Sequence, residues 1–529
     1  MINTFNRIKF GLLSLCILFV VSIFVILESF KYSSEKPPNI IFIMSDDHAK
    51  KAISCYGGNI NETINIDRLA NEGARFQNSF VTNSICAPSR AVFLTGKYSH
   101  INGLKDNLDM FDSGQLTFPK MLQNAGYQTA LIGKWHLKTK PQGFDTWKIL
   151  SGQGRYYNPL FITGEDTIRH QGYVTTLITD FAIETIDKFD KNRPFCLLYF
   201  HSAPHRNWMP DIKHLNMYDS IDVPLPNTFF DDYKTRSNAV KQQDMKIVDL
   251  YNSLDMKINS NDFIEKYSGG NKEFRFKAKQ YWTEIYNDMT DEQKTAWDSA
   301  YEPKNNAFIN ADLSGMELAK WKFQRYIKDY LRCVTSIDEN IGRLLGYLDK
   351  NNLVNNTIVI YTSDQGFYLG EHGWYDKRFM YEESLGIPMI IRYPKEIKPG
   401  IVLEPMVLNL DICSTILDFA DVNIPEEIQG ESLRPLLNGE KNQSWRKSIY
   451  YHYYEYPHGW HNVNRHEGIR TKDYKLINFY QMGEKELYNI EKDPNELNNL
   501  YKNKYYTQTK EKLEKELSYL RKKYQVPIN

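Results

Sequence analysis

Residues 84–97 read SICAPSRAVFLTGK. The strand-like stretch 76–82 leads into these residues, and Pro88 is placed as the first residue of a helix that ends near Gly96. Cys86 would then lie at a helix N-terminus, where unpaired N–H groups and the helix dipole favour an anion, and Arg90 adds a positive charge one turn on. A bare cysteine there suggests an activated thiolate, as in redox or phosphatase chemistry. The alternative is a buried structural cysteine before a proline turn.

Polar residues follow several apolar runs that are typical of buried strands. Asp46 and Asp47 follow the run at 39–44, and two adjacent acids at a buried strand end would repel each other unless a cation held them. Oxygen ligands of this kind favour Ca²⁺ or Mg²⁺ over zinc, and solvated loop aspartates are the alternative. Lys134 and His136 follow another such run, which places an oxyanion-binding charge and a titratable group at a second strand end.

Strand-like apolar runs alternate with helical patterns along most of the chain, which is typical of an α/β fold. With 529 residues, of which 42% are hydrophobic, the chain can bury a large core, and two structural units are expected. We predict a main domain at 36–445, with an insertion at about 206–318 where strand periodicity is lost. Short alternating strands and a charged amphipathic helix predict a smaller C-terminal α+β subdomain at 446–529.

The first 30 residues predict export. Residues 11–27 are almost wholly apolar and follow a short basic segment, the pattern of a signal peptide or of a signal anchor that stays in the membrane. We therefore expect a protein outside the cytoplasm, either periplasmic or anchored to the membrane by its N-terminus. Lys+Arg and Asp+Glu both number 65, so no global charge directs the protein to nucleic acid.

The pattern Cys-x-Pro-x-Arg at residues 86–90, followed by an apolar helix and Thr-Gly-Lys, resembles the signature of the type I sulfatases. In that family a maturation enzyme oxidises the cysteine to formylglycine, whose hydrated aldehyde attacks the sulfur of a sulfate ester. Other motifs follow in the family's order: Asp46-Asp47, Gly133-Lys134-Trp135-His136, His205, Asp364-Gln365-Gly366 and Lys377. The resemblance implies an alkaline-phosphatase-like sulfatase fold, with a central, mostly parallel sheet flanked by helices.

The resemblance also implies a role for each matching residue. One Ca²⁺, or less readily Mg²⁺, would be bound by four oxygen ligands: Asp46, Asp47, Asp364 and Gln365. Many family members have Asn in place of Gln365, which keeps the amide oxygen but is one methylene shorter. The reacting and sulfate-binding groups would be formylglycine at Cys86, the cations Arg90, Lys134 and Lys377, the base His136 and the acid His205.

Residues 364–384 and 461–471 resemble one branch of the family, the N-acetylglucosamine-6-sulfatases and mucin-desulfating sulfatases. This resemblance implies a sulfated glycan substrate and the removal of 6-O-sulfate from N-acetylglucosamine at a chain end. A net charge of zero also argues against a long basic track for an internal stretch of a polysulfated chain. The side chains expected to contact the sugar are His372, Asp376, Arg378, His458 and His461.

Several alternatives remain open at this point. A sulfatase could act at another position, such as the 2-O-sulfate of a uronate, and a phosphoester or phosphonate hydrolase of the same superfamily would use a similar metal and anion pocket. An inactive glycan-binding protein would require Cys86 to remain a thiol. A redox protein using Cys86 is the least favoured reading, because no resolving cysteine lies nearby.

Overall fold

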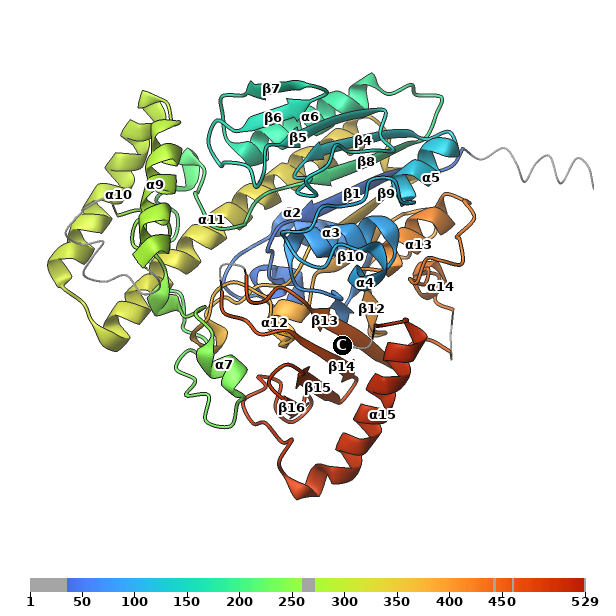
Figure 1. The fold of residues 1–529 in the computed structure, drawn as a ribbon. Helices are drawn as coiled ribbons and strands as arrows, with labels where there is room; N and C mark the ends of the chain where they lie inside the picture. The colour runs from blue at the N-terminus through green and yellow to red at the C-terminus, as the bar shows by residue number, and fades with distance from the viewer. Residues whose placement is uncertain (1–35, 259–271, 441–443, 459–460, 528–529) are drawn as a thin grey trace, which may run out of the picture.

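A computed structural model describes residues 36–258, 272–440, 444–458 and 461–527. The predicted export segment, residues 1–30, lies outside these ranges. Within them, no helix is both long enough and apolar enough to cross a membrane. The described elements form a large α/β unit and a smaller sheet with its own helix (Figure 1).

A ten-stranded sheet forms the centre of the large unit (Figure 1). In spatial order its strands are β11 (Ile401–Leu403), β2 (Ala74–Phe76), β10 (Met389–Arg392), β9 (Thr357–Ser363), β1 (Asn39–Ser45), β8 (Phe195–Phe200), β4 (Gln128–Gly133), β5 (Thr146–Leu150), β6 (Leu160–Thr163) and β7 (Asp166–Arg169). The five strands from β9 to β5 are parallel, whereas β10, β6 and β7 pair antiparallel with their neighbours. The predicted α/β fold with a mostly parallel sheet is confirmed.

Strand β1 is buried along its whole length and its side chains alternate between two cores. Ile41 and Ile43 enter one hydrophobic cluster, whereas Ile40, Phe42 and Met44 enter the other. The first cluster is covered by the helices α2 (Ile64–Glu72), α6 (Val174–Lys188) and α11 (Gly315–Lys350). The second is covered by α3 (Cys86–Thr95), α5 (Phe118–Asn124) and α13 (Asp411–Phe419). The sheet is therefore the middle of three layers.

The prediction of a single strand at 76–82 is wrong. The chain forms two short strands there: β2 belongs to the main sheet, and β3 (Ser79–Phe80) pairs in parallel with β12 (Val407–Leu408) in a separate two-stranded sheet. The change occurs at Gln77 and Asn78, between the two strands. The local sequence could not predict that the stretch divides between two sheets, because the partner strands come from residues more than 300 positions later in the chain.

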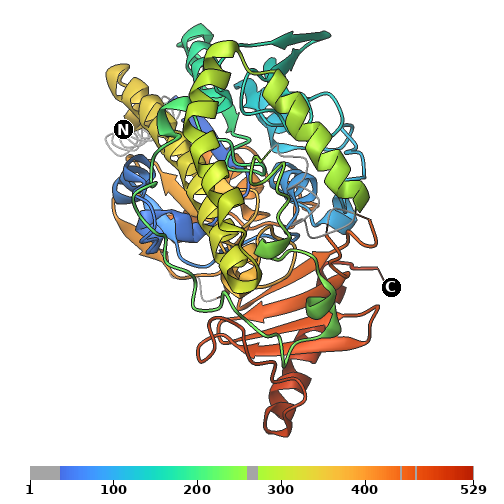
Figure 2. The same ribbon diagram turned by 90° about the vertical axis from the view of Figure 1, so that its left-hand side faces the viewer.

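The insertion contains helices α7 (Asn238–Gln242), α9 (Lys272–Asn287) and α10 (Asp291–Ala311). The last two form a pair that projects beside α11 (Figures 1 and 2). Helix α10 starts at a capping box in which Thr290 and Gln293 satisfy each other's backbone N–H groups. Short helices α4 (Ser99–Asn102), α12 (Glu382–Leu385) and α14 (Arg434–Leu437) complete the large unit.

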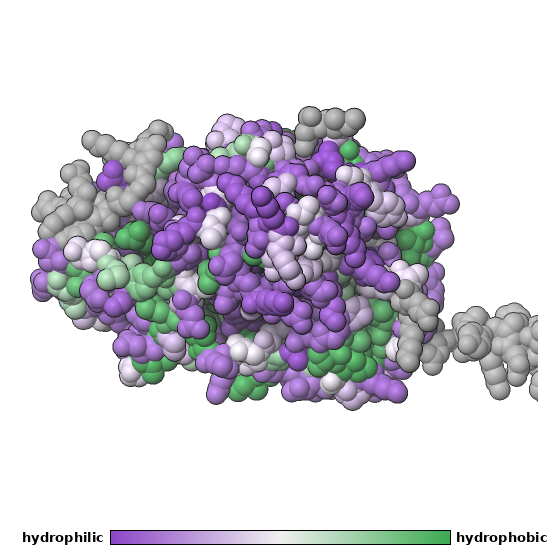
Figure 3. All heavy atoms as spheres, turned by 90° about the horizontal axis from the view of Figure 1, so that it is seen from below, coloured by the Kyte–Doolittle hydropathy of each residue, from purple (hydrophilic) through white to green (hydrophobic). Residues whose placement is uncertain are grey.

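The smaller unit is an antiparallel sheet of β13 (Ser448–Tyr453), β14 (His466–Thr471), β15 (Tyr474–Phe479) and β16 (Glu484–Asn489). Helix α15 (Thr507–Lys523) packs on it through Leu513, Leu517 and Leu520, which lie on one helix face. This sheet begins close to the predicted boundary at residue 446. The surface on this side of the molecule is mostly hydrophilic (Figure 3), as the lysine- and glutamate-rich sequence of α15 indicates.

Candidate active site

Three carboxylates meet where two neighbouring parallel strands end. Strands β1 and β9 pair with Ser45 opposite Ser363, so the residues that follow them emerge side by side. Carboxylate oxygens of Asp46, Asp47 and Asp364 all lie within 4.8 Å of one another. The backbone N–H of Asp47 also donates to Oδ1 of Asp364 at 3.1 Å. The predicted acidic ligands are therefore adjacent at the carboxyl edge of the sheet.

Gln365, the fourth predicted ligand, reaches the same cluster. Its Nε2 donates to Oδ1 of Asp47 and lies 3.6 Å from Sγ of Cys86. Its Oε1 is buried and has no hydrogen-bond partner among the described residues. An unsatisfied amide oxygen beside three carboxylates is a donor set that a hard cation prefers. The four residues therefore fit Ca²⁺ or Mg²⁺, and the longer side chain of Gln365 does not remove it from the set.

The carboxylates differ in their acidity. Burial raises the pKa of Asp364 to about 8, and the charge of Asp46 adds to this rise. Burial also raises the pKa of Asp47 to about 6, against the opposing charge of Lys377. Burial acts in the same direction on Asp46, but positive charges led by that of Lys134 hold its pKa well below the usual value. A bound divalent cation would favour the ionised form of all three carboxyl groups.

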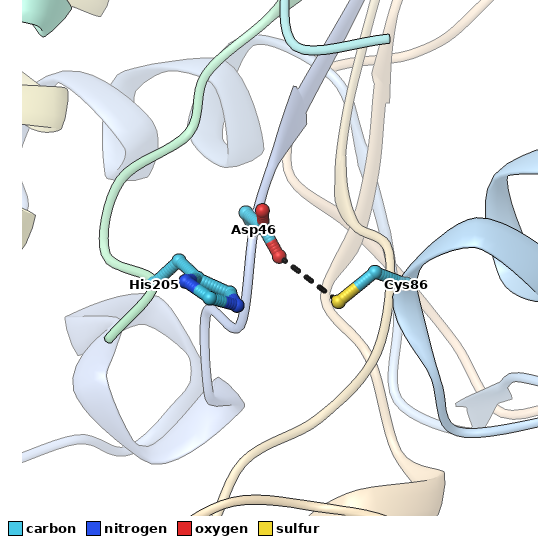
Figure 4. A group of neighbouring side chains, drawn as sticks. All are labelled: Asp46, Cys86 and His205. Carbon is cyan, nitrogen blue, oxygen red and sulfur yellow. Dashed lines mark hydrogen bonds between the residues drawn. The ribbon is translucent and has the colours of Figure 1, made fainter. Parts of the chain in front are cut away.

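Cys86 is the first residue of helix α3, two positions before the start predicted at Pro88. Proline is tolerated throughout the first turn, because no intrahelical partner is needed for the N–H there. The thiol is buried, and its Sγ lies 3.7 Å from Oδ1 of Asp46 (Figure 4). Burial raises the pKa of Cys86 to about 12. The encoded cysteine therefore stays a neutral thiol near pH 7, which argues against the thiolate and redox readings.

Three buried cations surround the acidic cluster, and each pairs with a different carboxylate. The pairs are Arg90 with Asp364 at 2.9 Å, Lys134 with Asp46, and Lys377 with Asp47 at 2.7 Å. The charges of the three positive and three negative side chains cancel, so a bound divalent cation would give the site a net positive charge. Such a site suits a sulfate monoester anion.

Two histidines approach the cluster from separate strand ends. Nε2 of His205 lies 3.8 Å from Oδ2 of Asp47, and its Nδ1 lies 2.7 Å from the carbonyl oxygen of Arg206. Since a carbonyl only accepts, Nδ1 carries a hydrogen and Nε2 faces the cluster. Nε2 of His136 lies 2.9 Å from the side-chain nitrogen of Gln153. Burial lowers the pKa of His205 to about 3 and that of His136 well below its usual value, so both rings are neutral here.

Several of these residues have a left-handed backbone that non-glycine residues seldom adopt. The φ angle is 65° at Asp47, 60° at His136, 75° at Asp376 and 95° at Arg378. Such conformations persist where the surrounding structure holds them, and they concentrate at functional sites.

A cavity of about 750 Å³ opens onto Cys86. The predicted site residues that line it with Cys86 are His205, Asp376, Lys377, Arg378 and His461. Lining residues that the sequence analysis missed include Asn107, Gln153, Arg206, Glu455 and, from α9, Phe274, Lys277 and Tyr281. Glu455 follows Tyr451 and Tyr453 at alternate positions, two residues beyond the end of β13, and this spacing is a signal that could have found it.

The structure does not bring His372 and His458 to this cavity. His372 is fully buried with Nδ1 3.0 Å from Oδ2 of Asp231. Nε2 of His458 lies 2.7 Å from Oδ2 of Asp106, so this histidine supports the loop that carries Asn107. Partners distant in the sequence hold both rings outside the lining of this cavity, and the sugar contacts expected of these two histidines stay a prediction.

A mostly parallel sheet with an acidic cluster and a cation-lined pocket at its carboxyl edge defines an alkaline-phosphatase-like hydrolase. The sequence matches the family described as Sulfatase over residues 38–422, and the one described as N-sulphoglucosamine sulphohydrolase, C-terminal over residues 370–523. The chain therefore belongs to the sulfatase family, and the protein is a sulfuric ester hydrolase. The predicted family is confirmed.

Individual relatives match almost the whole chain. It is 49% identical over 496 residues to an N-acetylglucosamine-6-O-sulfatase of Bacteroides thetaiotaomicron, a match that covers 92% of this chain and 87% of that protein. An arylsulfatase of Clostridium perfringens is 28% identical over 496 residues, covering 92% and 93%. A solved structure of a protein in complex with its substrate, D-glucosamine-2-N,6-O-disulfate, is similar with a TM-score of 0.87 at 48% identity, covering 93% of this chain and 98% of that one.

Proposed function

We propose that this sulfatase removes the 6-O-sulfate from N-acetylglucosamine, and from related glucosamines, at the end of a sulfated glycan. The observation that carries this proposal is the similarity, over more than nine tenths of the chain, to an N-acetylglucosamine-6-O-sulfatase and to a structure with a 6-O-sulfated glucosamine bound. The similarity includes the C-terminal unit that contributes Glu455 and His461 to the cavity. A cavity of about 750 Å³ suits one terminal sugar better than an internal stretch of chain.

The reaction requires two groups that the chain would acquire. A maturation enzyme would convert Cys86 to formylglycine, and Ca²⁺, with Mg²⁺ as the less favoured ion, would be held by the oxygen atoms of Asp46, Asp47, Asp364 and Gln365. When present, they supply a hydrated aldehyde whose hydroxyl can attack sulfur and a positive charge next to the sulfate oxygens.

The protein's own cations hold the sulfate group. Arg90, Lys134 and Lys377 enter the cluster from three different segments of the chain and are buried. Their N–H groups bind the sulfate oxygens and neutralise the negative charge that grows on them in the transition state. Because the site excludes most water, these interactions are stronger than they would be on the surface.

The two histidines would move the protons of the reaction. His136 is neutral, so its ring would act as the base toward the hydroxyl of a formylglycine at position 86. His205 keeps a hydrogen on Nδ1 through the carbonyl of Arg206 and directs Nε2 to the site. A sulfate anion bound beside it favours the protonated ring, which then donates a proton from Nε2 to the departing sugar oxygen.

The location of the protein is part of the same proposal. The apolar N-terminal segment supports export to the periplasm, or a position on the outer face of the membrane with the segment as an anchor. Sulfated glycans from outside the cell would be accessible in either position.

A panel of monosaccharides sulfated at position 2, 3, 4 or 6 tests the substrate. We expect the highest kcat/KM for N-acetylglucosamine-6-sulfate, and little turnover of the matched 6-phosphate. Preference for 2-O-sulfated uronate or 4-sulfated galactosamine would overturn the substrate proposal but leave the sulfatase chemistry intact. Faster turnover of the phosphate would favour the phosphoester hydrolase.

A further inference from the structure

The hydroxyl group of Tyr330 bridges two backbone groups of the turn formed by residues 46–49, which we name the ligand turn. It donates to the carbonyl oxygen of Asp47 at 2.7 Å and accepts the N–H of Ala49 at 2.8 Å. Tyr330 is fully buried and lies in helix α11, 283 positions after Asp47 in the chain. One side chain therefore holds the end of strand β1 against a helix that covers the sheet.

The N–H groups of the ligand turn all donate to partners distant in the sequence. The first three donate to groups at or just beyond the ends of strands β8 and β9: the carbonyl oxygen of Ala203 at 3.1 Å, Oδ1 of Asp364 at 3.1 Å and Oγ of Ser363 at 2.8 Å. The fourth acceptor, the Tyr330 hydroxyl, comes from a helix. Buried backbone groups need such partners, so loss of this hydroxyl would take a partner from both a buried N–H and a buried carbonyl.

Asp47 has a left-handed backbone with a φ angle of 65°, which a non-glycine residue adopts at a cost. Its ψ angle sets the direction of the carbonyl group that Tyr330 binds, so this hydrogen bond opposes a return to the common right-handed or extended conformations. In the left-handed conformation the Asp47 carboxylate lies within 4.8 Å of those of Asp46 and Asp364. A different backbone conformation would direct this carboxylate away from the expected cation.

The side chain of Asp47 has partners that the reaction would draw away. Its carboxylate accepts from Nζ of Lys377 at 2.7 Å and from Nε2 of Gln365. In the proposed function Gln365 binds the cation and Lys377 binds the sulfate, so neither contact is fixed through the reaction. The contact of Tyr330 is to the backbone, outside the ligand set, and it can stay in place whether or not cation and sulfate are bound.

Tyr330 is itself held by a neighbouring ring. It stacks on Phe367, with ring centres 5.8 Å apart and ring planes inclined by 11°. Phe367 follows the expected ligand Gln365 by two positions in the chain. The ring of Tyr330 therefore contacts the second segment that carries ligands, while its hydroxyl holds the first.

We propose that Tyr330 is a positioning residue for the cation. It fixes the ligand turn before the cation binds, with Asp47 in the left-handed conformation that places its carboxylate in the ligand set. This inference rests on the cation site of the proposed function and adds the residue that preorganises it. A site built in advance binds more tightly, because the cation does not have to order the turn. Tyr330 therefore contributes to the affinity for the cation and not to the chemical step.

Tyr330→Phe tests the inference, because it removes the hydroxyl and keeps the ring that packs on Phe367. We expect the Kd of the chelated protein for Ca²⁺, measured by calorimetry with Ca²⁺ alone, to rise about 10- to 100-fold. At saturating Ca²⁺ the variant should regain most of its kcat, since the four ligands and the groups that bind sulfate are unchanged. The Ca²⁺ concentration for half-maximal activity should rise by the same factor as the Kd.

The matched control is Tyr326→Phe, one turn earlier on the same helix. The hydroxyl of Tyr326 is equally buried and donates to the carbonyl oxygen of Tyr368 at 2.6 Å, outside the ligand turn. Both variants lose a buried hydrogen bond from a hydroxyl to a carbonyl, so both should lower the melting temperature of the metal-free protein. The control should leave the Kd for Ca²⁺ within about twofold of its original value. An unchanged Kd in Tyr330→Phe, or an equal change in both variants, would refute the inference.

Hydrogen exchange in the unaltered protein provides a test that does not depend on any variant folding. If Tyr330 holds the ligand turn in advance, the N–H of Ala49 should exchange slowly in the chelated protein, and Ca²⁺ should add little protection. Mass spectrometry of peptides that contain residues 47–49 measures this exchange. Rapid exchange that slows only when Ca²⁺ is added would mean that the cation shapes the turn, and would overturn the inference.

Failure of the proposed function has different signatures. Preference for another sulfated sugar would overturn the substrate proposal and leave the comparison of Kd values as it stands. An unaltered protein that binds no Ca²⁺ would refute the cation site, and the inference with it. Binding of Ca²⁺ with the same Kd in the unaltered protein and in Tyr330→Phe would refute the inference alone.

Discussion

The guanidinium of Arg206 and the carboxylate of Asp255 form a two-point ion pair, with Nε 2.7 Å from Oδ1 and Nη2 2.6 Å from Oδ2. Asp255 is fully buried, and the guanidinium lies 5.2 Å from the ring centres of both Tyr251 and Tyr375. The pair connects the insertion to the segment that carries His205. It therefore holds the carbonyl group that orients the proposed acid.

Asp255→Ala should destabilise the protein strongly, because it leaves the Arg206 charge in a buried position without its carboxylate. Removing one partner of a buried ion pair lowers the free energy of unfolding by roughly 3–5 kcal/mol. The control is Lys140→Ala, which breaks the exposed pair with Glu165 and should change stability very little. Urea or thermal unfolding measures both, and equal effects would contradict the role assigned to the buried pair.

Maturation at Cys86 should control activity. Cys86→Ala should lose turnover and keep its melting temperature, and Cys86→Ser should not restore turnover, since a serine has no second hydroxyl for release of sulfate. Peptide mass spectrometry across residue 86 measures the extent of conversion. Full activity in a sample that contains only unmodified cysteine would refute the mechanism.

The metal ligands should differ in their importance. Chelation should abolish activity, and Ca²⁺ or Mg²⁺ should restore it. Asp46→Ala should reduce activity more than Gln365→Ala, because it removes a charge as well as an oxygen ligand. Elemental analysis identifies the bound metal. Stoichiometric zinc, or full activity after chelation, would show that the assignment is wrong.

Calcium affinity should depend on pH. Burial raises the pKa of Asp47 to about 6 and that of Asp364 to about 8, so protons compete with the metal below these values. A carboxyl group with a raised pKa favours the folded state most when protonated, so the metal-free protein should lose stability as pH rises from about 4 to about 8. The increase in melting temperature caused by Ca²⁺ should grow over this range.

Calorimetry in two buffers with different heats of ionisation provides a second measurement of the same effect. Calcium binding at pH 6 should release protons, whereas binding at pH 9 should release almost none. An affinity that does not change between pH 5 and pH 8 would contradict these acidities.

His205→Ala should affect substrates according to their leaving group. A sugar oxygen requires a proton as it departs, so kcat/KM for the 6-sulfated sugar should fall roughly 10²- to 10⁴-fold. Nitrophenolate departs without a proton, so kcat/KM for 4-nitrophenyl sulfate should fall far less. His136→Ala is the matched control, because its step is common to both substrates. If His205→Ala lowered kcat/KM equally for both substrates, the assignment of His205 as the acid would be wrong.

The sequence by itself determined the features that depend on neighbours in the chain. The apolar run at 39–44 predicts a buried strand, and Asp46 and Asp47 lie at its end because the chain continues directly. The run that ends before Asp364 is recognised in the same way, and parallel pairing then makes the acids adjacent. Motif order predicted the cations and histidines, of which Lys134, His136 and His205 follow strand ends and Arg90 lies in α3.

Only the tertiary structure decided which distant side chains complete the cavity. Glu455 reaches Arg378 from a unit that the sequence separates from it by 77 positions. His372 and His458 have the residue type expected for sugar contacts, but Asp231 and Asp106 hold them elsewhere. The energy of such contacts depends on distance in space, which a local pattern of apolar and polar residues does not contain.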